Sequence, residues 1–138
     1  MKSITAFLLI AFITQSSQAA KPFNGKNLDG WKQKGPEAKS HLTVGTAKLD
    51  PKNPRNFVIS KGGHELINAR GGGFDFYSEA VFGDANIEVE VMVPKDSNSG
   101  IYVMGEYEIQ VLDSFGRTKL GGGDMGAIYG AAPPRVNA

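Results

Sequence analysis

The chain has 138 residues, with 15 Lys and Arg against 14 Asp and Glu, so its formal net charge is +1. This length fits one domain and excludes a two-domain enzyme or a long repeat array. The balanced charge provides no basic stripe for nucleic acid, and the absence of Cys excludes disulfides, thiolate zinc sites and cysteine nucleophiles.

The first 19 residues have the three regions of a secretory signal. Lys2 supplies the positive charge, an apolar run extends from Ile4 to Ile13, and small residues precede a cleavage site after Ala19. The run is shorter than the roughly 20 residues that a spanning helix needs. We therefore expect residues 1–19 to be removed on export, and residues 20–138 to form a periplasmic or extracellular domain without membrane contact. With no Cys to carry a lipid, the product is not expected to be a lipoprotein.

The rest of the chain favours short strands, because period-2 alternation is frequent and no window shows a helical period. The clearest strand is Ala85–Val93, in which aliphatic and polar residues alternate. Shorter candidates lie at 56–60, 65–68, 100–104, 106–112 and 127–129. The 100–104 and 106–112 segments are close enough to form a hairpin. The chain contains 18 Gly, and glycine clusters separate these strands. This pattern predicts an all-β, antiparallel β-sandwich, with too few strands for two complete facing sheets.

Two motifs are set aside after testing. Gly121–Gly126 matches the dinucleotide pattern G-x-G-x-x-G, but no strand precedes it and a β-prone segment follows it, so a cofactor loop is not predicted. His41 and His64 lie 23 positions apart in expected loops, and solvated histidines are favoured over metal ligands. The single Trp31 is interpreted as a core or edge anchor rather than as a sugar-stacking platform.

The segment Tyr107–Asp113 carries the most suggestive polar residues. In a strand, Glu108 and Gln110 share one face, and Ile109 and Val111 share the face expected toward the core. A carboxylate beside an amide suits sugar hydroxyls, which both donate and accept hydrogen bonds. The alternative, which the pattern alone favours, is an ordinary solvated sheet face. In Asn98–Tyr102 a glycine at the start of a strand marks either a close backbone approach or a plain turn.

Four motifs occur in order and together resemble the 3-keto-disaccharide hydrolase domain family, a concanavalin-like and laminin-G-like group. They are Phe23–Trp31, Asn98–Tyr102, Tyr107–Asp113 and Gly126–Gly130. The resemblance covers residues 21–138 and implies a jelly-roll sandwich in an exported bacterial protein that acts on glycans. Domains of this family extend beyond the point that matches residue 138, so the sequence resembles the N-terminal two-thirds or so of such a domain.

The resemblance also implies a substrate, a glycoside already oxidised to a ketone at C3. A base can then remove the acidified C2 proton and the C1 substituent leaves, without the paired carboxylates of ordinary glycosidases. On this basis the expected catalytic residues are Glu108 as base or metal ligand, Gln110 as a hydroxyl partner, Asp113 at the strand end, and Arg135 as an electrophilic or binding group. Further substrate contacts are expected from Tyr102, Tyr129, Glu79 and Asn98.

The cofactor and the function class stay open at this point. A divalent metal would stabilise the enolate, using carboxylate, His or carbonyl ligands. The same sandwich would also serve as a non-catalytic glycan-binding module or as a structural domain, since fold does not determine function. The expected partner is a carbohydrate, not nucleic acid or membrane, and neither the sugar nor the oligomeric state follows from the sequence.

Overall fold

The computed structural model describes residues 19–36 and 39–136, so the predicted signal lies outside the described residues apart from Ala19. Within these ranges the chain forms six strands and no α-helix, and no helix there could cross a membrane. The strands pair antiparallel in three two-stranded sheets: β1 (Trp31–Gln33) with β4 (Phe76–Ser78), β2 (Leu42–Leu49) with β3 (Phe57–Asn68), and β5 (Asn98–Val103) with β6 (Tyr107–Leu112).

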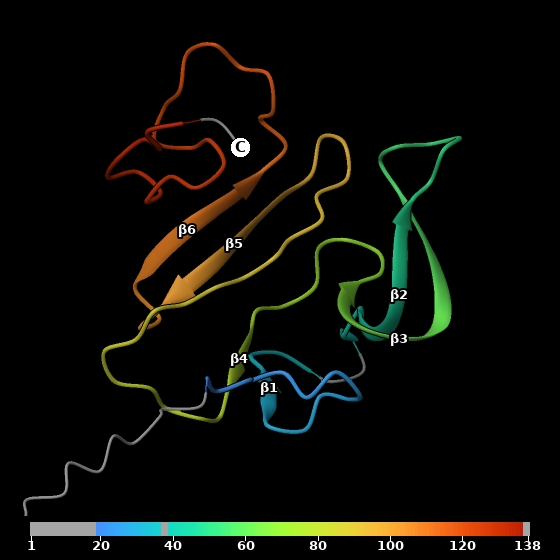
Figure 1. The fold of residues 1–138 in the computed structure, drawn as a ribbon. Coiled ribbons are helices and arrows are strands. Elements are labelled where there is room, and N and C mark those ends of the chain that lie inside the picture. The colour runs from blue at the N-terminus through green and yellow to red at the C-terminus, as the bar shows by residue number, and fades with distance from the viewer. Residues whose placement is uncertain (1–18, 37–38, 137–138) are drawn as a thin grey trace, which may run out of the picture.

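The predicted all-β, antiparallel class is therefore confirmed, and the small sheets are consistent with a β-sandwich. Figure 1 shows the β5–β6 hairpin and the β2–β3 pair on opposite sides of the molecule, with the short β1–β4 pair below them. Contacts between strands lie almost entirely within each sheet.

The β1–β4 pair is fixed by its aromatic residues. Trp31 packs on Phe76 with ring centroids 5.1 Å apart, and its indole Nε1 donates a hydrogen bond to the carbonyl of Pro22 at 3.1 Å. The indole ring thus packs on the Phe76 ring, while its N–H binds the backbone of the segment that precedes β1. Trp31 is an edge anchor, as the favoured interpretation of the sequence has it.

The β2–β3 pair contains a large bulge. Gly45 is opposite Glu65 while the next residue, Thr46, is opposite Ser60, so residues 61–64 loop out of the ladder. Gly63 has a φ of 115°, and a Cβ there would fall 2.7 Å from the carbonyl oxygen of Gly45. The predicted strands at 56–60 and 65–68 are thus two parts of one strand, interrupted at the predicted glycine turn. Strand β2 itself was not predicted. Its alternation changes phase between Gly45 and Thr46, where the register also shifts.

The β5–β6 hairpin confirms the prediction for this part of the chain. Its six residue pairs run from Asn98 opposite Leu112 to Val103 opposite Tyr107. The connection has φ of 58° at Met104 and 69° at Gly105, and the amide of Glu106 donates to the carbonyl of Val103 at 3.2 Å. Positive φ at both central residues is the requirement of a type I′ turn, which suits the twist of a hairpin.

A third segment lies along the free edge of β6. The amides of Gly126 and Tyr129 donate to the carbonyls of Gln110 and Glu108, and the amide of Gln110 donates to the carbonyl of Ala127. Ile128 forms an isolated bridge with Ile109, so the predicted final strand at 127–129 is present only as a bridge. This pairing brings the end of the chain beside the polar residues of β6.

The glycine-rich loop before this segment is held by one buried carboxylate. Asp124 accepts hydrogen bonds from Arg117 Nη1 at 2.6 Å and from the amide of Gly121 at 2.7 Å. The hydroxyl of Ser114 accepts one from the amide of Met125 at 3.0 Å. No helix follows the G-x-G-x-x-G motif, so it forms a closed loop and not a dinucleotide cradle.

The prediction of a strand at Ala85–Val93 is wrong. The segment has no regular structure, and Ile87, Val89 and Val91 are 62%, 56% and 44% exposed. A strand needs a neighbour to bind its backbone groups, and none of the described residues pairs with this segment. The buried apolar core of the described chain is correspondingly small and consists of Ala47, Ile67 and Ala127.

Candidate functional site

The residues expected at the site gather on one face of the β5–β6 hairpin. In an antiparallel pair, residues directly opposite each other share a face, and Tyr102 is opposite Glu108 while Gly100 is opposite Gln110. Alternation along β5 adds Asn98 to this face. The bridge between Ile109 and Ile128 places Tyr129 next to Glu108 on the same face. The sheet therefore brings together Asn98, Tyr102, Glu108, Gln110 and Tyr129.

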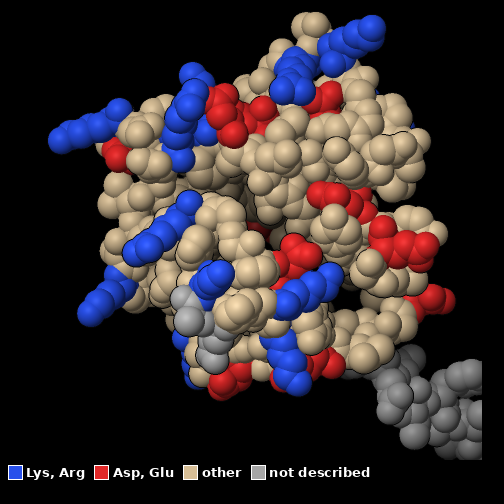
Figure 2. Space-filling view, turned by 180° about the vertical axis from the view of Figure 1, so that it is seen from behind, with Lys and Arg blue, Asp and Glu red and all other residues tan. Residues whose placement is uncertain are grey.

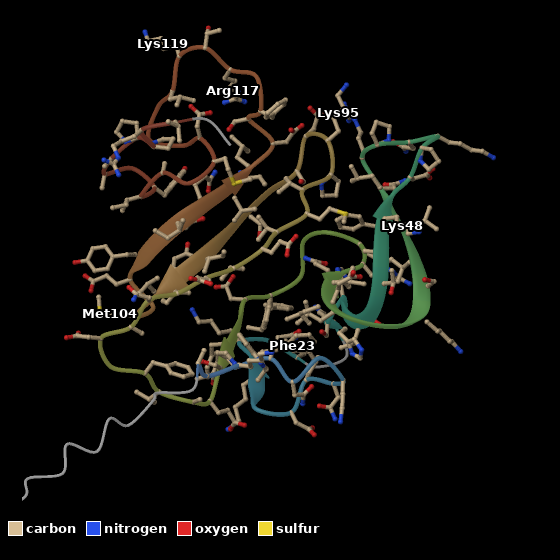
Figure 3. The ribbon with its side chains drawn as sticks, viewed as in Figure 1. Phe23, Lys48, Lys95, Met104, Arg117 and Lys119 are labelled. Atoms are coloured by element: carbon tan, nitrogen blue, oxygen red, sulfur yellow. The ribbon has the colours of Figure 1, made fainter. Side chains whose placement is uncertain are left out.

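Figure 3 labels the two ends of this arrangement: Met104 lies at the closed end of the hairpin, and Arg117 lies beyond the other end. The Tyr102–Glu108 pair is next to the closed end, and the Gln110–Asn98 pair lies toward the open end. The face thus has a carboxylate at one end and an amide pair at the other.

Tyr102 and Glu108 form a hydrogen-bonded pair. The Tyr102 hydroxyl donates to Glu108 Oε2 at 2.9 Å. This hydrogen bond is the main cause that raises the pKa of Tyr102 above its ordinary value, followed by the negative charge of Glu108, partial desolvation, Asp75 and Tyr129. Because ionising the phenol would place two anions side by side, Tyr102 stays a hydrogen-bond donor at neutral pH.

Gln110 is buried, with 2% of its surface exposed. Its Nε2 donates to Asn98 Oδ1 at 3.1 Å, whereas its Oε1 is buried and has no hydrogen-bond partner among the described residues. An unpaired buried acceptor is costly, so this oxygen is suited to accept a hydrogen bond from a hydroxyl group or a water molecule. Its burial differs from the expected orientation of β6, because Gln110 is buried whereas Ile109 and Val111 are only half-buried. Residues 126–129 pair with the edge of β6 beside Gln110.

The other three expected residues are not in contact with Glu108. Asp113 lies on the opposite face of β6, and its Oδ2 accepts a hydrogen bond from the amide of Asp96 at 2.9 Å. Glu79 forms an ion pair with Lys32 beside the β1–β4 sheet. Arg135 is exposed, and it makes no hydrogen bond or ion pair within the part of the chain that the structure describes. Catalytic or binding roles for these three residues stay predictions.

The Tyr102–Glu108 pair lies on open surface. A hollow of about 320 Å³ lies beside the open end of the hairpin, lined by Val91, Val93, Leu112, Asp113, Ser114, Phe115 and Met125. A second, of about 430 Å³, lies over the β1–β4 sheet. Neither is lined by Tyr102 or Glu108, so the site is identified by its polar geometry and not by a cavity. Figure 2 shows a hollowed face on which charges of both signs are interspersed.

A metal centre is not formed by the described residues. No group of three or more His, Asp or Glu side chains there is arranged to hold an ion. One oxygen of the Glu108 carboxylate already accepts the Tyr102 hydrogen bond. The metal-ligand role that the sequence left open for Glu108 stays a prediction, and no step of the proposed chemistry passes through a metal.

Two contributors to the site were missed by the sequence reasoning. Asp75, in the loop before β4, is among the charges that act on Tyr102. Asp124 holds the loop that leads to Tyr129. Asp124 could have been identified from its position three residues after Gly121 in a glycine-rich turn. Asp side chains commonly accept hydrogen bonds from nearby turn amides.

Comparison with known proteins gives one finding. A family model described as a 3-keto-alpha-glucoside-1,2-lyase-like domain matches residues 18–138, a range that contains every residue of the face described above. Searches of curated proteins and of solved structures found no significant match. The family match confirms the resemblance that the four ordered motifs indicate, and its name points to a glycoside-cleaving domain that acts on a sugar.

Proposed function

Because the chain belongs to the 3-keto-alpha-glucoside-1,2-lyase-like domain family, we propose that it cleaves 3-keto-glycosides, with Glu108 as the base. The observation that carries this proposal is the Tyr102–Glu108 pair beside Gln110 and Asn98 on one sheet face. It supplies a carboxylate, a phenol donor and an amide pair, the groups that suit a polyhydroxylated substrate.

The proposed reaction needs one base and one ketone. The free oxygen of Glu108 takes the C2 proton, and the C2–H electron pair forms the C2=C3 double bond of an enolate. When the C3 carbonyl re-forms, that pair becomes the C1=C2 double bond, and the C1–O bond breaks. The leaving oxygen then takes a proton from Glu108 or from water. Addition of water across C1=C2 makes the net result hydrolysis, and without that addition the result is elimination.

The neighbouring residues have supporting roles in this proposal. The Tyr102 hydroxyl holds the Glu108 carboxylate through a 2.9 Å hydrogen bond and keeps one oxygen free. Asn98 fixes the Gln110 amide, and the buried, unpaired Gln110 Oε1 is an acceptor for a sugar hydroxyl only after the side chain is uncovered by binding. Tyr129 forms a wall of the same face. A carboxylate held at one oxygen is restricted in orientation, which favours a productive approach to C2.

The test is Glu108→Gln with an aryl 3-keto-glucoside, measured by release of the phenol. We expect a loss of about 10²–10⁴-fold in turnover, the usual contribution of a general base. Glu88→Gln is the matched control, because Glu88 is an exposed carboxylate outside the described strands. In D₂O, the wild type should place deuterium at C2 of substrate recovered at partial conversion. Full turnover by Glu108→Gln would remove Glu108 from the base role.

The alternative is a glycan-binding module on the same sheet face. Binding of a 3-keto-glucoside without release of phenol and without C2 exchange would support that function and contradict the enzymatic one. Calorimetry with the wild type and with Gln110→Ala separates this outcome from a protein that does not bind sugar at all.

A further inference from the structure

Gly100 in β5 has no side chain, and the side chain of Glu108 in β6 lies over it. Glu108 is directly opposite Tyr102, so Gly100 is its diagonal neighbour on the same face. A Cβ built on Gly100 would fall 2.7 Å from both Cδ and Cγ of Glu108, and closer still to Oε1. Atoms in folded proteins do not approach this closely. The Glu108 side chain therefore occupies the volume that any side chain at position 100 would need.

The backbone does not explain this glycine. Gly100 is absent from the residues with positive φ, so its conformation is open to any amino acid. Gly63 is different, because it has a φ of 115° and a Cβ there would meet the Gly45 backbone. Of these two, only Gly100 is crowded by a functional side chain. Glycine within a strand weakens the strand relative to alanine, so the space left at this position is what distinguishes it.

We propose that Gly100 is a positioning residue for Glu108: its missing side chain lets the carboxylate lie across β5, where it accepts the Tyr102 hydrogen bond. With a methyl group at position 100, the Glu108 side chain has to leave this position and loses its contact with Tyr102. The catalytic consequence of this inference rests on the proposed function, whereas the structural consequence does not.

Gly100→Ala tests the structural consequence through Tyr102. The phenol of Tyr102 is followed by NMR with ¹³C-labelled tyrosine, and Tyr102→Phe identifies its signal among the four Tyr of the chain. The groups that act on it are Glu108, Asp75 and Tyr129, and the hydrogen bond to Glu108 is the largest influence. We expect the pKa of Tyr102 to fall in Gly100→Ala, because its hydrogen bond to Glu108 is lost, and to fall at least as far in Glu108→Ala, which removes both the hydrogen bond and the charge. An unchanged titration would overturn the proposal.

The catalytic consequence is measured with the same variant. We expect kcat to fall about 100-fold, as for a catalytic group displaced by about 1 Å, with a much smaller change in KM. Gly83→Ala is the control, since a Cβ there meets nothing within 4 Å. If the Tyr102 titration shifts but the wild type has no activity, the proposed function fails while the role of Gly100 in positioning stands. Wild-type turnover in Gly100→Ala would overturn that role.

A double-mutant cycle keeps the test informative if Gly100→Ala folds poorly. Glu108→Ala clears the crowded volume, so Gly100→Ala should then no longer lower the midpoint of urea unfolding. In the presence of Glu108 the same substitution should lower it. Equal shifts in the two backgrounds would show that the two positions are independent and would overturn the proposal.

Discussion

Replacement of Asp124 by alanine should destabilise the loop that supports the candidate site. The Asp124 side chain is 7% exposed and accepts two hydrogen bonds, from Arg117 Nη1 at 2.6 Å and from the Gly121 amide at 2.7 Å. Hydrogen bonds to a charged group contribute about 1.5–3 kcal/mol each. Because the Arg117 side chain is 53% exposed, water can solvate it after the substitution, which places its bond below that range. The expected loss is about 2–4 kcal/mol in total.

Urea unfolding followed by circular dichroism measures this loss. A domain with about 5–15 kcal/mol of stability would show a large fall in its unfolding midpoint. The control is Asp84→Ala, since Asp84 is exposed and makes no hydrogen bond or ion pair in the described part of the chain. A loss below about 0.5 kcal/mol, the range of an ordinary surface substitution, would refute the assignment of Asp124 as the anchor of this loop.

Two further predictions concern the strands. Met104→Asn should raise the free energy of unfolding by about 0.5–1 kcal/mol, because Asn adopts a positive φ at lower cost than Met. Met104 is 80% exposed and has a φ of 58°. A decrease in the urea midpoint would contradict this prediction. Ile67→Ala should cost about 2–3 kcal/mol, because Ile67 is 3% exposed. Ile59→Ala, at 36% exposure, should cost less than half as much, and equal losses in thermal unfolding would show that Ile67 is not part of the core.

The hairpin could be predicted from the sequence because its information is local. Alternation in 100–104 and 106–112 and the glycine between them determine the pairing within a short stretch of chain. The same local pattern brought Glu108 and Gln110 to one face. The resemblance added Tyr102, Tyr129 and Asn98, and the register places all three on that face.

The remaining features depend on partners that are distant in sequence. Ala85–Val93 alternates more regularly than any other segment, yet alternation alone does not provide a strand with a neighbour. Gln110 is buried because residues 126–129 pair with the edge of β6, which no pattern within β6 indicates. Asp113 looks like a residue of the site in sequence, but the pleat turns it to the opposite face, where it accepts a hydrogen bond from the Asp96 amide.

The separation of the strands into three small sheets has a consequence for hydrogen exchange. Contacts between strands lie almost entirely within each sheet, so each sheet can open without breaking the hydrogen bonds of the other two. Amide protection should therefore fall into separate groups, and not into one global unit. The amides of Gln110, Gly126 and Tyr129 form one such group, because they bind the same edge of β6. Binding of a sugar on this face should slow exchange in that group and leave the β2–β3 amides unchanged.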